Sequence, residues 1–289
     1  MTKKIICPIC ESRKSKQTIS LRKYSIYTCL NCDGKFLRPF PTTSELERFY
    51  QKEYFTGKHG GVSGYKDYKA LEQMLVLEAK KRLQFIKTIT NKKKLLDLGS
   101  GTGDFLKVAK DMGYKASGND ISDHAVKQLK MNGIKTYPGI ISNKTLPKKS
   151  FEIITAWDVI EHLPNIQNAV KAISDALVPG GYFILTTPNT NSIDAKILGK
   201  NWYGYKKIPE HLLYFNEKSI EYIFKRNNLD IVVIRNWGFI RTLGFVAEKL
   251  TFISSFFKPL PPLIKKLGVE KKYLFFPLTD FIVVAQKKH

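Results

Sequence analysis

The segment LLDLGSGTGDF, from Leu95 to Phe105, constrains the fold of this chain more than any other stretch. Its first apolar residues predict a buried parallel strand, and the helical pattern that starts at Phe105 predicts a direct turn from strand to helix. Gly99, Gly101 and Gly103 alternate in that turn. Glycine accepts positive φ angles and lets a ligand approach the backbone closely. The segment therefore predicts a ligand-binding turn in an α/β fold.

An acidic residue stands where a fold of this kind binds a ribose. Asp120 follows Gly103 by 17 residues, at the end of a second short strand pattern over residues 114–119. A carboxylate at that position can accept hydrogen bonds from both ribose hydroxyls. The two features together predict a cofactor that contains adenosine, and a purely structural turn is the alternative.

The glycine spacing selects among adenosine cofactors. Dinucleotide-binding turns have the spacing Gly-x-Gly-x-x-Gly, whereas this chain has Gly-x-Gly-x-Gly preceded by Asp97. Asp104 would also repel a pyrophosphate from the first helical turn, although it suits the helix dipole. A zwitterionic amino-acid tail fits such a turn better. We therefore expect S-adenosylmethionine rather than a dinucleotide.

Further motifs follow the glycine turn: NDIS at residues 119–122, FEIITAWD at 151–158, LVPGG at 177–181 and TPN at 187–189. With this set the chain resembles the class I S-adenosylmethionine-dependent methyltransferases over residues 90–235, and it is similar to ubiquinone-pathway and sugar methyltransferases. The resemblance implies a Rossmann-like, doubly wound α/β sheet of seven strands, in which the last strand, at 280–285, is antiparallel.

The resemblance also assigns cofactor-binding residues. Asp97 and the three glycines would line the methionine end, Asp120 would bind the ribose, and residues 141–143 would flank the adenine. No carboxylate follows the third expected strand, so backbone or the Asn143 amide would contact the adenine amino group. The full predicted set is Asp97, Gly99, Gly101, Gly103, Asp120, Ile121, Asn143, Trp157 and Asp158.

Strand and helix patterns alternate from residue 94 onward, which is typical of a parallel sheet covered by helices. We expect strands at 94–98, 115–119, 134–138, 151–157, 181–187 and 230–236, and helices at 103–112, 122–131, 165–177 and 216–227. Two segments stand outside this alternation, a substrate loop at 188–215 and an apolar insertion at 238–279. The insertion can cap the substrate, contact a membrane surface or form an oligomer interface, and cap packing is the preferred interpretation.

All four cysteines lie in the first 32 residues, as the pairs Cys7/Cys10 and Cys29/Cys32, with 18 residues between the pairs. Four thiolates at this spacing can close a tetrahedral Zn²⁺ site. The alternating pattern between the pairs predicts a β-hairpin, so we expect a structural zinc ribbon over residues 1–40. Such a ribbon has too little core to fold alone, and the metal would supply its folding energy.

A helical connector or lid is expected between the ribbon and the sheet, over residues 41–90. A capping-box pattern predicts a short helix at 45–51, and a glycine-rich stretch at 57–64 is either a mobile lid or a simple loop. An amphipathic pattern predicts one long helix at 66–89. The remaining part, 91–289, would then be the methyltransferase domain.

Candidate catalytic residues follow the fourth expected strand. Glu161 and His162 come just after Asp158, and a helical turn there would bring the three side chains to one face. They can accept protons, hold a divalent cation or only order the loop. A similar cluster in the ubiquinone-pathway O-methyltransferases is associated with a divalent metal. His211, in the expected substrate loop, is the second candidate because a neutral imidazole commonly accepts the proton of a hydroxyl.

Charge and hydropathy limit the binding partners and the cellular location that we expect for this chain. Its 289 residues carry a formal net charge of +23, spread over many lysines. Such charge suits phosphates on nucleic acid, nucleotide-sugars or anionic lipids, although solvated lysine faces explain it equally well. The sequence contains no run of 18 apolar residues and no secretory signal pattern. We therefore expect a cytoplasmic protein without a transmembrane segment, for which peripheral membrane contact stays open.

The preferred function is methyl transfer to a hydroxyl or sugar-type acceptor on a small molecule, in glycan, lipid or quinone biosynthesis. A zinc-ribbon methyltransferase of rRNA or tRNA is the alternative. Against it, the sequence has no Asn/Asp-Pro-Pro-Tyr motif for an exocyclic base nitrogen, and the ribbon uses every cysteine that could attack a pyrimidine ring. The intact glycines and Asp120 argue against a binding module without catalysis.

Overall fold

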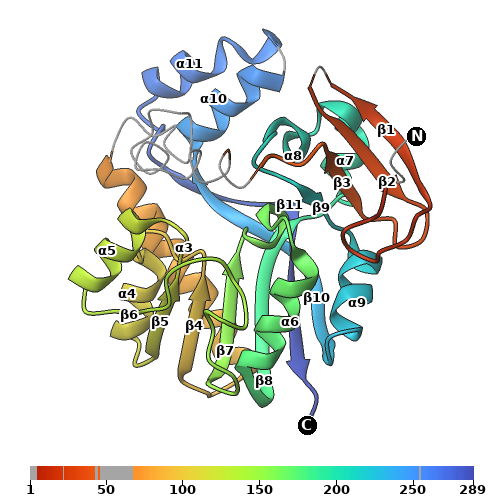
Figure 1. Ribbon diagram of the computed structural model, residues 1–289. Helices are drawn as coiled ribbons and strands as arrows, with labels where there is room; N and C mark the ends of the chain where they lie inside the picture. The colour runs from red at the N-terminus through yellow and green to blue at the C-terminus, as the bar shows by residue number, and fades with distance from the viewer. Residues whose placement is uncertain (1–4, 22, 43–44, 46–67, 254) are drawn as a thin grey trace.

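The computed structural model describes residues 5–21, 23–42, 45, 68–253 and 255–289. A seven-stranded sheet with the order β10-β11-β8-β7-β4-β5-β6 forms its centre (Figure 1). The strands are β4 (Lys94–Leu98), β5 (Lys115–Asn119), β6 (Lys135–Thr136), β7 (Phe151–Trp157), β8 (Leu177–Pro188), β10 (Leu229–Thr242) and β11 (Tyr273–Lys287). β11 is antiparallel to both of its neighbours, and the pairs from β8 to β6 are parallel. The predicted doubly wound sheet with an antiparallel last strand is confirmed.

Helices cover both faces of this sheet, because alternate residues of its buried strands point to opposite layers. Leu95 and Ile153 belong to one apolar cluster, whereas the adjacent Leu96 and Ile154 belong to the other. The first cluster is shared with α3 (Tyr68–Ile89), α4 (Asp104–Asp111) and α5 (Asp123–Met131). The second is shared with α6 (Ile166–Ala176) and α9 (Glu217–Lys225). The near-continuous apolar runs in the sequence therefore reflect burial on both sides.

The N-terminal ribbon forms a second sheet. The hairpin predicted between the cysteine pairs is present as β1 (Ser15–Ser20) and β2 (Ser25–Cys29), and β3 (Lys35–Arg38) follows it. A fourth strand, β9 (Leu213–Tyr214), comes from the expected substrate loop and pairs with β3. The ribbon is thus continuous with a segment that lies far along the chain (Figure 1).

The expected substrate loop is largely helical. It contains α7 (Ile193–Leu198), the 3₁₀ turn η2 (Gly199–Asn201) and α8 (Tyr203–Lys206). Another 3₁₀ turn, η1 (Ile160–His162), follows β7 and carries two of the candidate catalytic residues. These short elements lie at the end of the sheet where the parallel strands terminate (Figure 1), which is where α/β folds bind their ligands.

The apolar insertion is shorter than its sequence pattern indicates. β10 and β11 continue past the sheet as a two-stranded ribbon, with Thr242 opposite Tyr273, so the strands expected at 230–236 and 280–285 are both too short. Among the described residues, the elements between them are α10 (Leu243–Ile253), η3 (Ser255–Phe257) and α11 (Leu260–Lys266). Aromatic residues of a strand pair and of a cap look alike in sequence, which explains the difference. Cap, membrane contact and oligomer interface stay predictions for this hairpin of helices.

Two expected elements fall outside the described residues, namely the body of the short helix at 45–51 and the glycine-rich stretch at 57–64. The long helix expected at 66–89 is present as α3. The third strand, expected at 134–138, is reduced to two residues in β6. Within the described ranges, no helix has the length and apolar character needed to cross a membrane.

Candidate active site

The turn between β4 and α4 has the backbone that its glycines predict. The φ angles of Gly99, Gly101 and Gly103 are +61°, +52° and +87°, a region that side chains rarely adopt. A Cβ on Gly99 would lie 2.7 Å from Val159 Cγ2, and one on Gly103 would lie 2.6 Å from Leu129 Cδ2. Conformation therefore favours glycine at all three positions, and close packing adds to this preference at Gly99 and Gly103.

Asp120 lies directly against this turn. Its Oδ2 accepts a hydrogen bond from the Gly101 amide at 2.9 Å, and its Oδ1 accepts one from the Ser122 amide at 2.9 Å. Burial raises the pKa of this carboxyl group, although the backbone hydrogen bonds oppose the shift. The carboxylate at the end of β5 is thus fixed beside the glycine turn, within reach of a ligand bound over it.

Asp97 is buried on β4, the strand next to β5. Thr155 Oγ1 donates to its Oδ1 at 2.6 Å, and burial raises its pKa to about 7. The positive charge of Arg82 opposes that shift. A carboxylate in this position can accept hydrogen bonds from the ammonium group of an amino-acid ligand, which would also return it to the ionised form.

Arg82, on α3, is a candidate site residue that sequence reasoning missed. Its guanidinium lies 4.6 Å from the centre of the Trp157 ring, and Trp157 in turn packs edge-on against Phe105 at 5.4 Å. Neither Arg82 Nε nor Trp157 Nε1 has a hydrogen-bond partner in the described part of the chain, although both are buried. An arginine on the polar face of an amphipathic helix gives no signal of its own, because such positions are usually solvated.

The remaining predicted cofactor residues have less distinctive surroundings. Ile121 is 42% exposed beside Asp120, as a residue that packs on a bound ring would be. The Asn143 amide donates to Asp175 on α6 at 3.1 Å, so this side chain already has a partner away from the glycine turn. Asp158 has a left-handed backbone with φ of +57°, and its carboxylate accepts from Thr186 Oγ1 at 2.8 Å.

The structure brings Glu161, His162 and His211 together. Glu161 is 1% exposed, and its Oε2 accepts a hydrogen bond from Thr187 Oγ1 at 2.9 Å. The ring centres of His162 and His211 are 4.8 Å apart, with the rings nearly perpendicular. The potential ligand atoms of the three side chains all lie within 4.8 Å of one another. Two of these residues come from η1 and the third from the segment just before β9.

Each imidazole ring of this cluster is oriented by a backbone group. His162 Nδ1 contacts the Glu210 carbonyl oxygen at 2.9 Å, which places a proton on Nδ1 and leaves the lone pair on Nε2. That Nε2 is 3.9 Å from Glu161 Oε1. The His211 ring has a backbone partner at Gly204. Buried Glu161 Oε1 and His211 Nδ1 have no hydrogen-bond partner among the described residues, so both are open to an exogenous group.

Burial controls the charge of the cluster. It raises the pKa of Glu161 to about 8, together with the negative charge of Asp158. It lowers the pKa of His162 to about 4 and that of His211 well below its usual value, and the nearby Lys207 adds to both shifts. Both imidazoles are therefore neutral near pH 7. Each can accept a proton or donate a lone pair to a metal.

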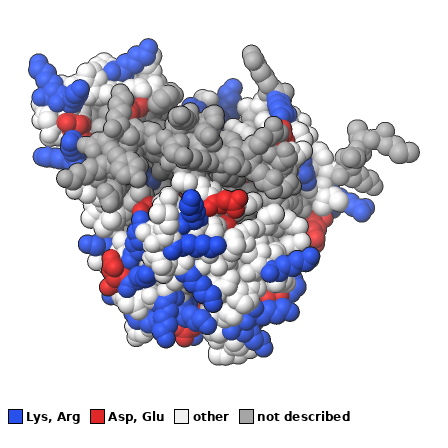
Figure 2. Space-filling view, turned by 60° about the vertical axis from the view of Figure 1, so that its left-hand side comes forward, with Lys and Arg blue, Asp and Glu red and all other residues white. Residues whose placement is uncertain are grey.

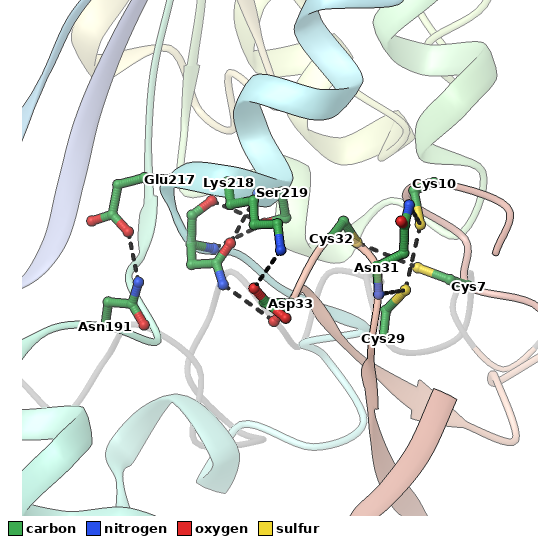
Figure 3. A network of polar contacts seen from close by, with 11 residues as sticks. Cys7, Cys10, Cys29, Asn31, Cys32, Asp33, Asn191, Glu217, Lys218 and Ser219 are labelled. Atoms are coloured by element: carbon green, nitrogen blue, oxygen red, sulfur yellow. Dashed lines mark hydrogen bonds and ion pairs between the residues drawn. The ribbon is translucent and has the colours of Figure 1, made fainter. Parts of the chain in front are cut away.

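The four cysteines form a compact cluster in the ribbon, away from these carboxylates and imidazoles. The Sγ atoms of Cys7 and Cys32 are 3.8 Å apart and those of Cys10 and Cys29 are 3.4 Å apart. All four sulfurs lie within 4.8 Å of one another (Figure 3). A tetrahedral zinc site with Zn–S bonds of about 2.3 Å places sulfurs about 3.8 Å apart. The predicted clustering of the cysteines is confirmed, and its dimensions fit zinc.

Comparison with known proteins agrees with this arrangement. The family profile described as "Methyltransferase domain" matches residues 70–234, more than half of the chain. A ubiquinone biosynthesis O-methyltransferase from Idiomarina loihiensis is 31% identical over 142 residues, which cover 46% of this chain and 56% of that protein. One from Shewanella halifaxensis is 25% identical over 108 residues, covering 34% and 45%. The chain thus spans about half the length of the curated relatives it matches.

Solved structures share the fold. A SAM-dependent methyltransferase from Archaeoglobus fulgidus has a TM-score of 0.52 and 22% identity, and the match covers 76% of this chain and all of that one. A SAM-dependent methyltransferase from Thermotoga maritima, described as a possible histamine N-methyltransferase, has a TM-score of 0.52 and 17% identity, with coverage of 84% and 98%. At these identities the likeness shows the architecture alone.

Proposed function

We propose that this chain, which belongs to the methyltransferase domain family, transfers a methyl group from S-adenosylmethionine to a hydroxyl group of a small molecule. One observation carries the proposal. β4, which ends in the glycine turn, lies between β5, which leads to Asp120, and β7, which leads to η1 and the buried cluster of Glu161, His162 and His211. A donor over the turn and an acceptor against the cluster would meet at one edge of the sheet.

The cofactor half supplies binding. The positive-φ glycines and Asp120 fit the ribose and the backbone-facing side of the nucleoside. Asp97 fits the ammonium group of the methionine moiety, and the orphaned Arg82 Nε fits its carboxylate. This pairing of an acid with a base suits a zwitterion, whereas it would not suit a pyrophosphate.

The other half supplies a proton acceptor. The acceptor oxygen attacks the methyl carbon as the carbon–sulfur bond breaks, and the hydroxyl proton passes to His211 Nδ1. His211 is suited to this role because it is neutral and its Nδ1 has no hydrogen-bond partner among the described residues. Burial raises the pKa of Glu161 to about 8, and a positive charge on the imidazole would favour ionisation of this carboxyl group, whose carboxylate would then stabilise the charged imidazole across the cluster. His162 would orient both groups.

A divalent cation is a second candidate role for the same three residues. Glu161 Oε1, His162 Nε2 and His211 Nδ1 converge, and each ligand is oriented by a partner on its far side, as metal-binding side chains usually are. Such a cation, when bound, would lower the pKa of a coordinated hydroxyl group. Activity measured with and without added Mg²⁺, Mn²⁺ or Zn²⁺ separates this role from proton transfer by His211 alone.

We also propose that the four cysteines hold a structural Zn²⁺. The buried sulfurs and their spacing support it. The backbone amide of Asn31, which donates to Cys29 Sγ at 3.4 Å, supports it as well. Four thiolates would fill a tetrahedral site and leave no position for a substrate. Metal analysis should give about one zinc per chain, and a folded chain without zinc would contradict this assignment.

The acceptor class rests on the relatives and on charge. The curated relatives are named for ubiquinone biosynthesis, which makes phenolic hydroxyls the first acceptors to test and sugar hydroxyls the second. Figure 2 shows basic side chains in several separate groups on the face in view, whereas a nucleic-acid groove usually has a continuous stripe.

The proposal is tested with methyl-labelled S-adenosylmethionine. Small-molecule extracts, purified phenols and total RNA are incubated with the chain, and labelled products are identified by mass spectrometry. We expect a labelled hydroxyl in the small-molecule fraction. Label that enters only RNA would replace the proposal with the nucleic-acid alternative. The absence of labelled product in every fraction would contradict the proposal.

A further inference from the structure

One residue next to His211 joins the ribbon to the active site. The Leu212 amide donates to the Glu161 carbonyl oxygen at 2.9 Å, and the Leu212 carbonyl accepts from the Leu37 amide at 2.8 Å. Leu37 belongs to β3, the ribbon strand that follows the second cysteine pair. Leu212 is fully buried between them. The backbone of this segment is therefore fixed to η1 on one side and to the ribbon on the other.

A second link holds the far end of the same segment. Asn216, the N-cap of α9, accepts from the Ser219 amide at 2.8 Å through Oδ1 and donates through Nδ2 to the Asp33 carbonyl at 3.2 Å. Asp33 follows Cys32 directly, and its carboxylate forms an ion pair with Lys218 at 2.8 Å (Figure 3). One amide side chain thus caps a helix and binds the backbone of a cysteine knuckle.

Close packing makes this contact rigid. A Cβ on Gly34 would lie 2.6 Å from Ile9 Cδ1 and 3.0 Å from Ser219 Cβ, so the knuckle rests directly on the first turn of α9. Tyr214 adds an internal brace, because its hydroxyl donates to the His211 carbonyl at 3.1 Å. Residues 211–216 are consequently clamped at both ends by groups of the ribbon.

The cofactor half has no such link. No hydrogen bond among the described residues joins the stretch 97–122 to the ribbon at 5–38. Loosening the ribbon should therefore displace His211 relative to Glu161 and leave the glycine turn in place. A small displacement matters, because an error of about 1 Å in a reacting group can cost about a hundredfold in rate.

We infer that the ribbon is a positioning element for proton transfer: its cysteine knuckle, acting through Asn216 and Leu212, sets the position of His211. A Zn²⁺ in the ribbon would then be needed for turnover as well as for the fold of the ribbon. The inference rests on the proposed role of His211. The cysteine cluster would then contribute to catalysis by positioning His211, although it lies outside both η1 and the glycine turn.

The test uses two substitutions of Asn216 in the full chain. Asn216→Asp and Asn216→Ser both keep a side-chain oxygen to cap α9. Asp has no donor for the Asp33 carbonyl, and Ser replaces the amide with a hydroxyl on a side chain one atom shorter, so both lose the Nδ2 hydrogen bond. Asn165→Asp is the matched control, because Asn165 caps α6 by accepting from the Asn168 amide at 3.3 Å. Each variant is measured for kcat, for S-adenosylmethionine Kd, and for the rate at which diethylpyrocarbonate modifies His211, read by peptide mass spectrometry.

We expect kcat to fall about tenfold to a hundredfold in both Asn216 variants, with Kd unchanged and His211 modified several times faster. The control should match the native chain in all three. A fall in kcat with unchanged modification of His211, or no change at all, would overturn the inference.

A thiol reagent gives an independent measurement. Every cysteine of the chain lies in the ribbon, so an organomercurial would modify the ribbon thiols, release the proposed Zn²⁺ and leave the imidazole cluster unmodified. Its titration should raise the modification rate of His211 while Kd stays constant, and a constant modification rate would contradict the inference. If His211→Ala is fully active, the proposed function fails, whereas the modification rates still report whether the ribbon positions His211.

Discussion

At the ends of β4 and β5 the proposed cofactor half of the active site is built from residues that are close in sequence, with glycines of positive φ beside two buried aspartates. At the ends of β7 and β8 the proposed proton-accepting half is assembled from η1, the segment before β9 and the N-terminal ribbon. The first half depends on local backbone conformation. The second depends on long-range contacts, so distant substitutions should affect it selectively.

The largest expected effect comes from removing the proton acceptor. His211→Ala should lower kcat by about a hundredfold to ten-thousandfold, because no other neutral imidazole has an open Nδ1 in the cluster as described. Isothermal titration should show an unchanged Kd for S-adenosylmethionine, since no hydrogen bond joins His211 to the glycine turn among the described residues. His289→Ala, at the exposed C-terminus, is the control. A weakened Kd with normal kcat would reverse the assignment of the two halves.

The next effect tests the glycine turn by a matched pair. Gly103→Ala combines a φ of +87° with a Cβ 2.6 Å from Leu129 Cδ2, whereas Gly113→Ala has a similar φ of +83° and nothing within 4 Å. Thermal or urea unfolding should therefore show a loss of about 1 kcal/mol for Gly113→Ala from backbone strain alone. Gly103→Ala should lose about 1–3 kcal/mol more from overpacking. Equal losses would show that the turn can relax around a side chain.

A smaller effect sharpens the role of Arg82. Arg82→Met keeps much of the apolar stem beside Trp157 but removes the charge, and it should raise the Kd for S-adenosylmethionine about tenfold through the loss of one charged hydrogen bond. Lys80→Met, two residues away and exposed on the same helix, should leave the Kd unchanged. Similar Kd values for the two variants would exclude Arg82 from the binding site.

The smallest effect concerns the ion pair between Lys218 and Asp33. Both side chains are more than half exposed, at 58% and 51%, and exposed pairs contribute about 0–1 kcal/mol. Lys218→Ala should therefore leave the midpoint of urea unfolding close to that of the native chain and leave kcat unaltered. This separates the exposed charge contact from the buried Asn216 contact beside it. A large loss of kcat would indicate that Lys218, rather than Asn216, holds residues 211–216 in place.

The same contrast explains what could be predicted from sequence. The alternation of strands and helices, the glycine turn and the cysteine hairpin follow from periodicity, φ requirements and ligand spacing, which are local properties. The antiparallel last strand was expected from the family resemblance. β9 could not be predicted, because a two-residue strand acquires its identity only by pairing with β3. Arg82 could not be identified from the sequence for a related reason, because Trp157 and Asp97, with which it interacts, lie on other elements.

The catalytic cluster was predicted only in part. Glu161, His162 and His211 were each singled out from sequence, but their convergence depends on Leu212 and on the ribbon strand behind it. The strands around the apolar insertion were underestimated because cross-strand pairs such as Thr242 and Tyr273 carry no signal along the chain.

The most direct test of the account is an equilibrium titration of S-adenosylmethionine into the native chain and into Asp120→Ala. The account predicts saturable binding of one molecule by the native chain and binding at least about tenfold weaker in the variant, because a charged acceptor for the ribose hydroxyls is lost. Equal affinity in the two chains, or no binding by the native chain, would contradict it.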